Sequence, residues 1–518
     1  MSVLRLAIPT PLRSLFDYLP PAGTSEDLLA SLQPGLRVRV PFGKRELTGY
    51  LLAVVEKSDL PPEQLKPACE LLDREPLIPP SLLQLGEWAC SYYHHPPGEV
   101  LSALFPRRLR EGKSHQRLGQ PGWELTVKGK GLPQGAMSRS PRQAEALALL
   151  QGAAVLPRQA FEESGISSAV LRSLKEKGLI QPSTISAGTV PAATREELQL
   201  NSEQAPVLEA LTQSGAGFSC HLLEGVTGSG KTEIYLQLIA LCLAAGRQAL
   251  VLVPEIGLTP QTLARFEKRF SANIVVMHSG LSESQRYQSW EAARDGSAHI
   301  VIGTRSAVLA PLGRLGLLIV DEEHDSSYKQ QDGFRYSARD VAVKRAQLED
   351  CPVLLGSATP SLESIHNANQ GRYHFHELTS RAGDAQLPSI HLLDVRKQSL
   401  KAGMSEPLVE EIKTALSRGG QVLLFLNRRG YAPTLQCHDC GWIAECSACD
   451  ARLTVHRRQR RLRCHHCART QTLPQQCPVC HSRQLMTHGL GTEQAEEQLH
   501  AMFPGTPVFR VDSDSMQG

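Results

Sequence analysis

Eight consecutive residues match the pattern of a phosphate-binding loop: Gly225, Val226, Thr227, Gly228, Ser229, Gly230, Lys231 and Thr232. An apolar run, "HLLE", precedes the loop, and a segment expected to be helical, "EIYLQLIALCLAAG", follows it. Glycines let backbone N–H groups surround phosphates, and the N-terminus of the helix adds partial positive charge. Lys231 would reach the β- and γ-phosphates, and the Thr232 hydroxyl would join Mg²⁺. The spacing therefore predicts an ATP site that uses Mg²⁺.

A second acidic element supports this interpretation. In "LGLLIVDEEH", Asp321 and Glu322 come at the end of an apolar run that is expected to be a buried strand. Asp321 can hold Mg²⁺ through its hydration shell, and Glu322 can polarise the attacking water. The alternative, a solvated acidic turn, explains neither the strand nor the phosphate loop. Together the two elements predict nucleotide hydrolysis.

The surroundings of these elements resemble a superfamily 2 helicase. Gln204, in "LNSEQAPVLEAL", lies one element before the phosphate loop, where such helicases read adenine. The segments "VPEIGLTPQ", "GTRSAVLAP" and "GSATPS" follow predicted strands in the order that these motors use for DNA contact and for coupling to hydrolysis. Arg305, in the second of these segments, is a candidate DNA-binding residue. Each segment alone could be an ordinary loop, but their shared order indicates a motor.

Four Cys-x-x-Cys pairs predict a metal-binding module: Cys437/Cys440, Cys446/Cys449, Cys464/Cys467 and Cys477/Cys480. Because Zn²⁺ takes four thiolates in a tetrahedron, two closed structural zinc sites follow. Pairing the hooks in sequence would leave only five residues to join the first two hooks. Nesting the second and third hooks inside the first and fourth gives a spacing near that of common zinc ribbons, and we favour it. An iron–sulfur cluster is the alternative.

The same segment is strongly cationic. Eight arginines occur between Arg452 and Arg483, and no Asp or Glu occurs from Ala451 to Thr492. Such a lobe suits phosphate backbones or an acidic partner, although a solvated charged face is the simpler alternative.

Length and composition set wider bounds. The chain of 518 residues is too long for one core, so three or four domains are expected. Its 41% hydrophobic and 21% charged residues are ordinary for a soluble globular protein, and the net charge of +3 identifies no partner. The N-terminus shows no signal-peptide core, and no apolar run approaches the roughly 20 residues that span a bilayer. We therefore predict a cytoplasmic protein with no membrane partner.

The order of patterns predicts a multidomain α/β protein. Residues 1–105 carry short β-rich runs and are expected to form a β-rich domain, with 106–137 as a linker. Residues 138–190 contain three short helical patterns and an extended segment, which favour a winged helix over a plain three-helix bundle. Buried parallel strands alternate with helices over 198–400, the first ATPase lobe, and 405–518 is a partial second lobe with a zinc module at 437–480.

The quoted motifs, with "DEEHDSSYKQQ", "FLNRRGYAP" and "CHDCGWIAEC", resemble the PriA family of primosomal replication-restart helicases (primosomal protein N′) along the whole chain. The resemblance implies RecA-like parallel-sheet helicase lobes with a zinc-binding insertion, and it also implies the nested pairing of the cysteines. It further implies a DNA-dependent ATPase and 3′→5′ helicase that recognises stalled or abandoned replication forks and initiates primosome assembly. The implied partners are branched and single-stranded DNA, single-stranded DNA-binding protein and other primosome proteins.

The loop after the acidic motif, "DSSYKQQDGFRYSARD", interleaves aromatic and cationic residues. Tyr328, Phe334 and Tyr336 could stack on unpaired bases while Lys329 pairs with phosphates. The alternative is an ordinary loop with packed rings. The resemblance favours DNA contact, since the family has an aromatic-rich loop here that links DNA binding to hydrolysis.

In the N-terminal domain the resemblance alone suggests a role. It implies capture of the 3′ end of a nascent strand by Phe16 and Asp17 of "LFDYLP" with Lys66. An aromatic ring can stack on the terminal base, and a carboxylate can accept a hydrogen bond from a 3′-hydroxyl. Without the resemblance, Phe16 reads as a core residue and Asp17 as part of a turn.

The end of the sequence predicts an incomplete second lobe. After Gly420, only "QVLLFLN" and "PVFRV" read as core strands, and the family continues with a glycine–arginine motif that this chain lacks. Losing such an arginine costs roughly 10³–10⁵ in rate in related NTPases. We therefore expect a truncated helicase that binds ATP, zinc and DNA, hydrolyses ATP poorly and does not unwind duplexes, unless Arg428 or Arg429 replaces that arginine. A non-unwinding DNA- and ATP-binding module is the alternative function.

Overall fold

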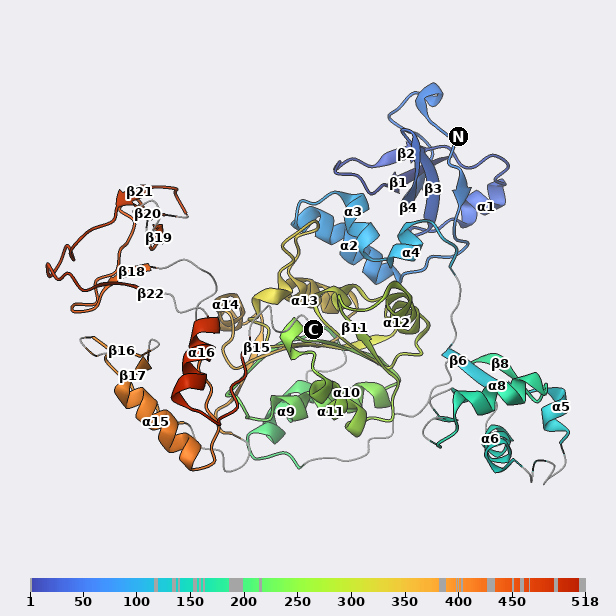
Figure 1. The fold of residues 1–518 in the computed structure, drawn as a ribbon. Helices are drawn as coiled ribbons and strands as arrows, with labels where there is room; N and C mark the ends of the chain where they lie inside the picture. The colour runs from blue at the N-terminus through green and yellow to red at the C-terminus, as the bar shows by residue number, and fades with distance from the viewer. Residues whose placement is uncertain are drawn as a thin grey trace. The chain divides into compact units, whose positions relative to one another are not determined.

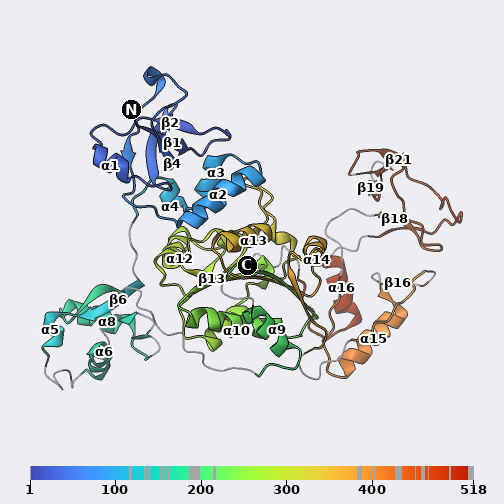
Figure 2. The ribbon, with the colours of Figure 1, turned by 180° about the vertical axis from the view of Figure 1, so that it is seen from behind.

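A computed structural model describes the chain over residues 2–115, 120–132, 137, 140–151, 156–157, 160–161, 164–185, 199–213, 217–381, 388–396, 398, 400–401, 404–425, 434–449, 451–456, 461–464, 466–488 and 492–511. Contacts divide the chain into two compact units, Met1–Gln386 and Leu387–Gly518. Figures 1 and 2 show the elements of both units. None of the helices in the described residues is long and apolar enough to cross a membrane.

The N-terminal domain contains an antiparallel sheet of five strands in the order β2-β1-β4-β3-β5. The strands are β1 (Val3–Ala7), β2 (Phe16–Tyr18), β3 (Arg37–Phe42), β4 (Arg45–Val55) and β5 (Glu70–Leu71), with helix α1 (Glu26–Ser31) and the 3₁₀ turn η1 (Pro62–Gln64) in their connections. Alternate residues such as Leu4, Leu6, Val38 and Val40 are fully buried in one cluster. The period-2 pattern thus builds the predicted β-rich domain.

Helices α2 (Pro80–Tyr92), α3 (Pro97–Ala103) and α4 (Arg107–Arg110) join this sheet to the ATPase lobe. One hydrophobic cluster runs from Tyr50 and Leu82 through to Trp290 and Val341 of the lobe. The Trp290 indole N–H donates to the carbonyl of Leu104 at 3.0 Å. A shared core of this kind is expected to make the two parts move as one body.

A buried ion pair between Arg37 and Asp73 holds the end of the helical connection between the N-terminal sheet and the ATPase lobe. Both side chains are nearly inaccessible, and the Arg37 guanidinium donates to the Asp73 carboxylate through Nε and one Nη, each at 2.8 Å. Its other Nη donates to the carbonyls of Leu109 and Lys113. Strand β3 is thereby tied to the segment after α4.

The predicted linker 106–137 holds regular structure, which differs from the prediction. Besides α4 it contains β6 (Gln120–Leu125) and α5 (Val127–Lys130). Strand β6 is the centre of an antiparallel sheet in the order β7-β6-β8, with β7 (Leu156–Pro157) and β8 (Ile180–Ile185). The polar, glycine-rich sequence makes β6 hard to predict, because Trp123 and Leu125 are the residues of β6 that join the core among those whose burial is described.

Helices α6 (Pro141–Gln151) and α8 (Ser168–Glu176) complete this small domain over the core of Leu147, Phe161, Leu171 and Leu174. These match two of the three helices predicted from the sequence. The helix predicted for "LPRQAFEESG" does not begin where predicted, because Leu156 and Pro157 form strand β7, although residues 160–161 are helical and residues 158–159 and 162–163 lie outside the described residues. Two helices packed with a three-stranded sheet, whose last strand β8 follows α8, are the parts of a winged helix.

The ATPase lobe contains a seven-stranded sheet in the order β11-β12-β10-β13-β14-β9-β15, and every neighbouring pair is parallel. The strands are β9 (Cys220–Gly225), β10 (Gln248–Leu252), β11 (Ile274–Met277), β12 (Ile300–Gly303), β13 (Leu315–Asp321), β14 (Val353–Ser357) and β15 (His374–Leu378). The strands predicted over this lobe are confirmed where the apolar runs "ALVLVP", "IVVMH", "HIVIGT", "LGLLIVD" and "PVLLGS" form β10 to β14. Strand β15, at the edge, carries the unexpected sequence "HFHEL".

Helices cover both faces of this sheet (Figure 1). On one face lie α9 (Gln204–Gln213), α10 (Lys231–Ala244) and α11 (Pro260–Arg269), and on the other lie α12 (Glu283–Asp295) and α13 (Ala338–Leu348). Along β10, Leu250 and Leu252 belong to one core whereas Ala249 and Val251 belong to the other. Helix α14 (Leu362–Asn369) and three 3₁₀ turns, η2 (Glu255–Gly257), η3 (Arg305–Leu309) and η4 (Ser326–Tyr328), complete the lobe.

The second unit contains an antiparallel sheet in the order β21-β20-β19-β18-β22 and a separate helical cluster. Its elements are β16 (Leu400–Lys401), β17 (Met404–Ser405), α15 (Glu406–Ser417), β18 (Thr434–Cys437), β19 (Thr454–His456), β20 (Arg461–Arg463), β21 (Thr470–Thr472), β22 (Leu485–His488) and α16 (Thr492–Met502). Met404, Ile412 and Phe503 form the core of the helical cluster.

The two core strands predicted for the second lobe are not formed, so that prediction was wrong for the described residues. Residues 421–425 and 508–511 have no strand structure, and Leu423 and Phe509 are 89% and 86% exposed. A strand needs a hydrogen-bonding neighbour, and the described part of this unit offers none to these segments, although Leu424 packs against the helical cluster. Arg428, Arg429 and the last residues from Asp512 lie outside the described residues.

Replacing Asp73 with Asn should lower the free energy of unfolding of the first unit by about 3 kcal/mol or more, because the Arg37 guanidinium would stay buried without a counter-charge. Urea unfolding followed by tryptophan fluorescence measures this change. As a control, Glu70→Gln removes one charge from the exposed pair with Arg39 and should cost under about 1 kcal/mol. Equal losses for both variants would contradict a special role for the buried pair.

Candidate functional site

The phosphate loop connects β9 to α10, as the sequence predicts. Gly228 and Gly230 have φ angles of +84° and +85°, which side chains rarely adopt, and Gly230 is the N-cap of α10. Lys231 begins the helix and is buried, and its Nζ donates to the carbonyl of Gly225 at 2.6 Å. The lysine side chain thus folds back over the loop whose phosphate ligand it is predicted to bind.

The interior of the loop fits a phosphate ligand. The Ser229 hydroxyl is buried and has no hydrogen-bond partner among the described residues. A Cβ atom on Gly225 would lie 2.6 Å from this hydroxyl and 3.1 Å from the Lys231 side chain, so glycine leaves the space free. A polar cradle with an unsatisfied hydroxyl and a lysine at a helix N-terminus suits the phosphates of a nucleotide.

Gln204, the predicted adenine reader, is buried at the start of α9. Its side-chain amide donates to the carbonyl of Ser229 at 2.9 Å and accepts from the Asn201 backbone N–H at 3.0 Å. The structure therefore brings Gln204 onto the phosphate loop. An amide has further donor and acceptor capacity, which leaves room for contact with a base.

Asp321 and Glu322 end β13 and face the same edge of the sheet. The Tyr235 hydroxyl donates to Asp321 Oδ1 at 3.0 Å, and the Tyr328 hydroxyl donates to the Asp321 carbonyl at 2.6 Å. Burial raises the pKa of the Asp321 carboxyl above its ordinary value. Burial also raises the pKa of Tyr235 well above its ordinary value, so this hydroxyl remains a donor.

Glu322 has an unusual backbone. Its φ of +47° is rare for a residue with a side chain, and such strain is concentrated at functional sites. The side chain remains 38% exposed, and its Oε2 lies 3.6 Å from His324 Nδ1. An accessible carboxylate at this position agrees with the predicted contact to a water molecule.

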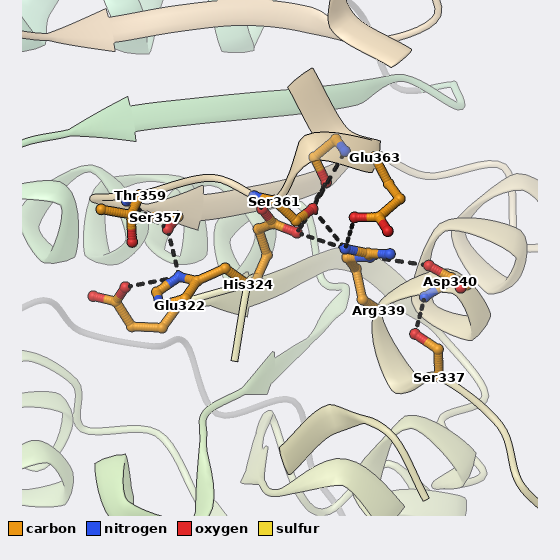
Figure 3. Close-up of polar contacts among 11 residues, drawn as sticks. Glu322, His324, Ser337, Arg339, Asp340, Ser357, Thr359, Ser361 and Glu363 are labelled. Atoms are coloured by element: carbon orange, nitrogen blue, oxygen red, sulfur yellow. Dashed lines mark hydrogen bonds and ion pairs between the residues drawn. The ribbon is translucent and has the colours of Figure 1, made fainter. Parts of the chain in front are cut away.

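The third and fourth residues of the acidic motif, which sequence reasoning did not single out, join it to "GSATPS". His324 Nδ1 and the Ser357 hydroxyl share a hydrogen bond of 2.7 Å, which Figure 3 shows. The buried carboxylate of Glu323 accepts from the backbone and hydroxyl of Ser361 and from Arg339 at 2.6, 3.0 and 3.2 Å. Only the contacts made in the fold identify these roles, because the sequence shows no more than polar residues.

Arg339 is the centre of this network (Figure 3). Besides Glu323 it donates to the Ser361 hydroxyl at 2.6 Å and to Asp340 at 2.9 Å. Since Arg339 lies near the end of the aromatic-rich loop, the network connects that loop to Ser361 of "GSATPS".

The aromatic-rich loop differs from the prediction. Tyr328, Phe334 and Tyr336 are all buried, so their rings are not available to stack on bases in this conformation. Phe334 packs against Tyr93 and His95, whose ring centroids lie at 5.9 and 5.4 Å. Burial of large rings against aromatic neighbours of the N-terminal domain accounts for the difference.

Of the cations predicted to contact DNA, Lys329 lies in this loop and Arg305 contacts it. Lys329 is exposed, with its Nζ 5.4 Å from the centroid of the Tyr93 ring. Arg305 donates to the carbonyls of Ser327 and Lys329 at 2.8 and 3.1 Å, and so holds the loop in place. A pocket of about 440 Å³ near the loop is lined by residues that include Arg110, Arg286, His278 and Ser306.

Phe16, Asp17 and Lys66 all line one pocket of about 580 Å³ in the N-terminal domain. The Asp17 carboxylate accepts two hydrogen bonds from Arg5, each of 3.0 Å, and one from Ser58 at 2.7 Å. The hydrogen bonds from Arg5 lower the pKa of Asp17 below its ordinary value. The structure therefore brings together an aromatic ring, an ionised carboxylate and a lysine.

The eight cysteines form two groups with the predicted nested pairing. The groups are Cys437, Cys440, Cys477 and Cys480, and Cys446, Cys449, Cys464 and Cys467, each with all sulfur atoms within 4.8 Å of one another. A hydrogen bond from the backbone N–H of Cys467 lowers the pKa of Cys464 to about 6, which favours a thiolate. Four sulfur ligands fill a tetrahedral zinc site, so these are two Cys₄ zinc-binding sites of the closed, structural type.

Comparisons with known families match four parts of the chain. The descriptions are "3'DNA-binding domain (3'BD)" for residues 5–106, "Primosomal protein N'-like, winged helix" for 121–181, "DEAD/DEAH box helicase" for 201–368 and "PriA DNA helicase Cys-rich region (CRR) domain" for 446–471. Their order agrees with the domains described above.

Two similar proteins are the "Replication restart protein PriA" of Haemophilus influenzae and that of Bacillus subtilis. The first is 46% identical, and the alignment covers 99% of this chain and 70% of the relative. The second is 34% identical, with 96% and 71% covered. With its DEAD/DEAH-box ATPase and helicase domain, its DNA-binding domains and its cysteine-rich region, the chain belongs to the PriA family of replication restart DNA helicases.

Proposed function

We propose that the protein is an ATP-dependent 3′→5′ DNA helicase that recognises stalled or abandoned replication forks and initiates primosome assembly in the cytoplasm. One observation carries this proposal. The pocket lined by Phe16, Asp17 and Lys66 belongs to a domain whose core continues into the ATPase lobe. A captured 3′ end would therefore stand at a fixed position relative to the motor.

ATP and Mg²⁺ are the proposed ligands of the phosphate loop. The backbone N–H groups of 225–232 and Lys231 would hold the phosphates, while the Thr232 hydroxyl and Asp321 would hold the metal ion. Mg²⁺ supplies charge neutralisation on the phosphates as hydrolysis proceeds. Gln204 would contact adenine, and Glu322 would orient the attacking water and take its proton.

Branched and single-stranded DNA are the proposed substrates. The pocket beside the aromatic-rich loop offers Arg110, Arg286 and His278 to phosphates, together with the exposed Lys329. Tyr328, Phe334 and Tyr336 would reach bases only after the loop leaves its present packing. We also propose single-stranded DNA-binding protein and other primosome proteins as partners, by analogy with the family, and Zn²⁺ as the metal of both cysteine groups.

Replacing Lys231 with Ala should weaken ATP binding by about 10- to 100-fold, because a charge-assisted contact is lost, and should abolish DNA-stimulated ATP turnover. Binding to fork DNA, measured by fluorescence anisotropy, should stay within about twofold of the wild type. Lys413→Ala, which removes a lysine from an exposed ion pair, is the matched control. Loss of fork binding together with turnover would contradict the separation of end capture from the motor.

Replacing Asp17 with Ala should abolish the preference for a 3′-hydroxyl over a 3′-phosphate end. The carboxylate would accept from the hydroxyl, and its loss also frees Arg5, which favours the phosphate. We expect affinities for the two fork ends that differ by about tenfold in the wild type and by under about twofold in the variant. Glu26→Ala, on the exposed helix α1, should retain the preference, and retention by Asp17→Ala would exclude the assigned role.

Metal analysis of the purified chain should find two zinc ions and no iron. Replacing Cys446 with Ser should release one ion and leave the site of Cys437, Cys440, Cys477 and Cys480 filled, because the two groups share no ligand. Cys69→Ser, an exposed cysteine outside both groups, should release none. Loss of both ions from the Cys446 variant would indicate that the two groups share one site. Detection of iron in the purified chain would contradict zinc as the proposed metal.

A further inference from the structure

Tyr235 lies on α10 one turn after Lys231, and its side chain reaches the acidic motif. The residue is 2% exposed, and its hydroxyl donates to Asp321 Oδ1 at 3.0 Å. A buried tyrosine hydroxyl needs a polar partner, and here the partner is the carboxylate expected to face Mg²⁺. The helix that carries the phosphate-loop lysine thus also holds the metal-facing aspartate.

The neighbouring strand makes room for this contact. Gly356 of β14 pairs with Asp321 of β13 in the parallel ladder. A Cβ atom at Gly356 would lie 1.8 Å from the Tyr235 hydroxyl oxygen and 2.8 Å from its Cζ atom. Any side chain at this position would therefore displace the ring, so the glycine of "GSATPS" is required for the hydrogen bond.

The main chain of Asp321 is held separately. Its carbonyl accepts from the Tyr328 hydroxyl at 2.6 Å, so the backbone position does not depend on Tyr235. The Asp321 carboxylate accepts from the backbone N–H of Glu322 and from the Tyr235 hydroxyl, and only the second of these two donors comes from α10. With Oδ1 held by the phenolic hydrogen bond, the carboxylate would face the water shell of Mg²⁺.

We propose that Tyr235 is a positioning residue that orients the Asp321 carboxylate toward Mg²⁺ and sets its spacing from Lys231. The inference rests on the proposed binding of nucleotide with Mg²⁺ and adds a residue to that site. A purely structural tyrosine would instead contribute through its ring, which fills the core between α10 and the sheet. Tyr235→Phe separates the two roles, because it keeps the ring and removes only the hydroxyl.

The test measures ADP binding to the full chain by titration calorimetry, once with Mg²⁺ and once with a chelator. In the wild type Mg²⁺ should strengthen binding. Tyr235→Phe should bind metal-free ADP as the wild type does. With Mg²⁺ present, the variant should bind ADP about tenfold more weakly than the wild type, which is the size expected for one hydrogen bond to a charged group. Tyr50→Phe, another buried tyrosine in the N-terminal domain, should change neither affinity.

A double-mutant comparison strengthens the test. In an Asp321→Asn background, which removes the metal-facing carboxylate, Tyr235→Phe should add no further loss. Gly356→Ala, which displaces the hydroxyl while Tyr235 itself is unchanged, should reproduce the loss of the Mg²⁺ effect. This variant provides the test if Tyr235→Phe does not fold.

Two results would overturn the inference. One is a full Mg²⁺ effect in Tyr235→Phe, and the other is an equal loss of affinity with and without the metal, which would place the effect on the phosphate loop. Absence of any Mg²⁺ effect in the wild type would instead overturn the proposed function on which the inference rests.

Discussion

The parallel pairing of β9, β14 and β13 is the constraint on which the ATPase site depends. Parallel strands end at the same edge of a sheet, so residues more than a hundred positions apart gather there. In this register Glu224 lies beside Ser357, and Gly356 lies beside Asp321. The phosphate loop, the acidic motif and "GSATPS" therefore meet through backbone geometry, before any side-chain contact forms. The glycine–tyrosine fit at Gly356 is possible only in this register.

Burial of polar groups at that edge supplies the second level of organisation. Glu323 is almost completely buried, and an isolated charge there would be unstable. Its carboxylate therefore requires the donors Ser361, Ser364 and Arg339 together. Because Arg339 lies in the first turn of α13, at the end of the aromatic-rich loop, a change in that loop has to alter the environment of a buried carboxylate next to Glu322. This gives the loop a physical path to the hydrolytic residues.

The sequence predicted the parts of the fold whose patterns are strong. Strands β10 to β14 are apolar because both of their faces are buried, and the cysteine spacing restricts the metal pairing. Strand β15 was not predicted because it lacks an apolar run. As an edge strand it is only partly covered, so it can carry the exposed polar residues His374 and Glu377. The described residues of the strands expected at 421–427 and 508–511 did not form strands for the opposite reason, since an apolar run is necessary for a buried strand but does not supply the neighbours that bury it. Tyr235 and Glu323 could not be found from the sequence, because only the packing shows that a common tyrosine and a common glutamate face the site.

The aromatic-rich loop shows how two domains determine one local conformation. Phe334 and Tyr336 pack on each other at 4.8 Å, and Phe334 contacts Tyr93 and His95 of the N-terminal domain. Arg305 binds the carbonyls at the start of the loop, and the Tyr328 hydroxyl binds the carbonyl of Asp321. Base stacking on these rings would have to replace aromatic contacts of comparable strength, so DNA gains little from the rings alone. Phosphate contacts to nearby cations would have to supply the remaining free energy, and movement of the loop would then disturb Tyr328 and the backbone of Asp321 together. If DNA binds here as proposed, the loop would therefore respond only when bases and phosphates are bound at the same time.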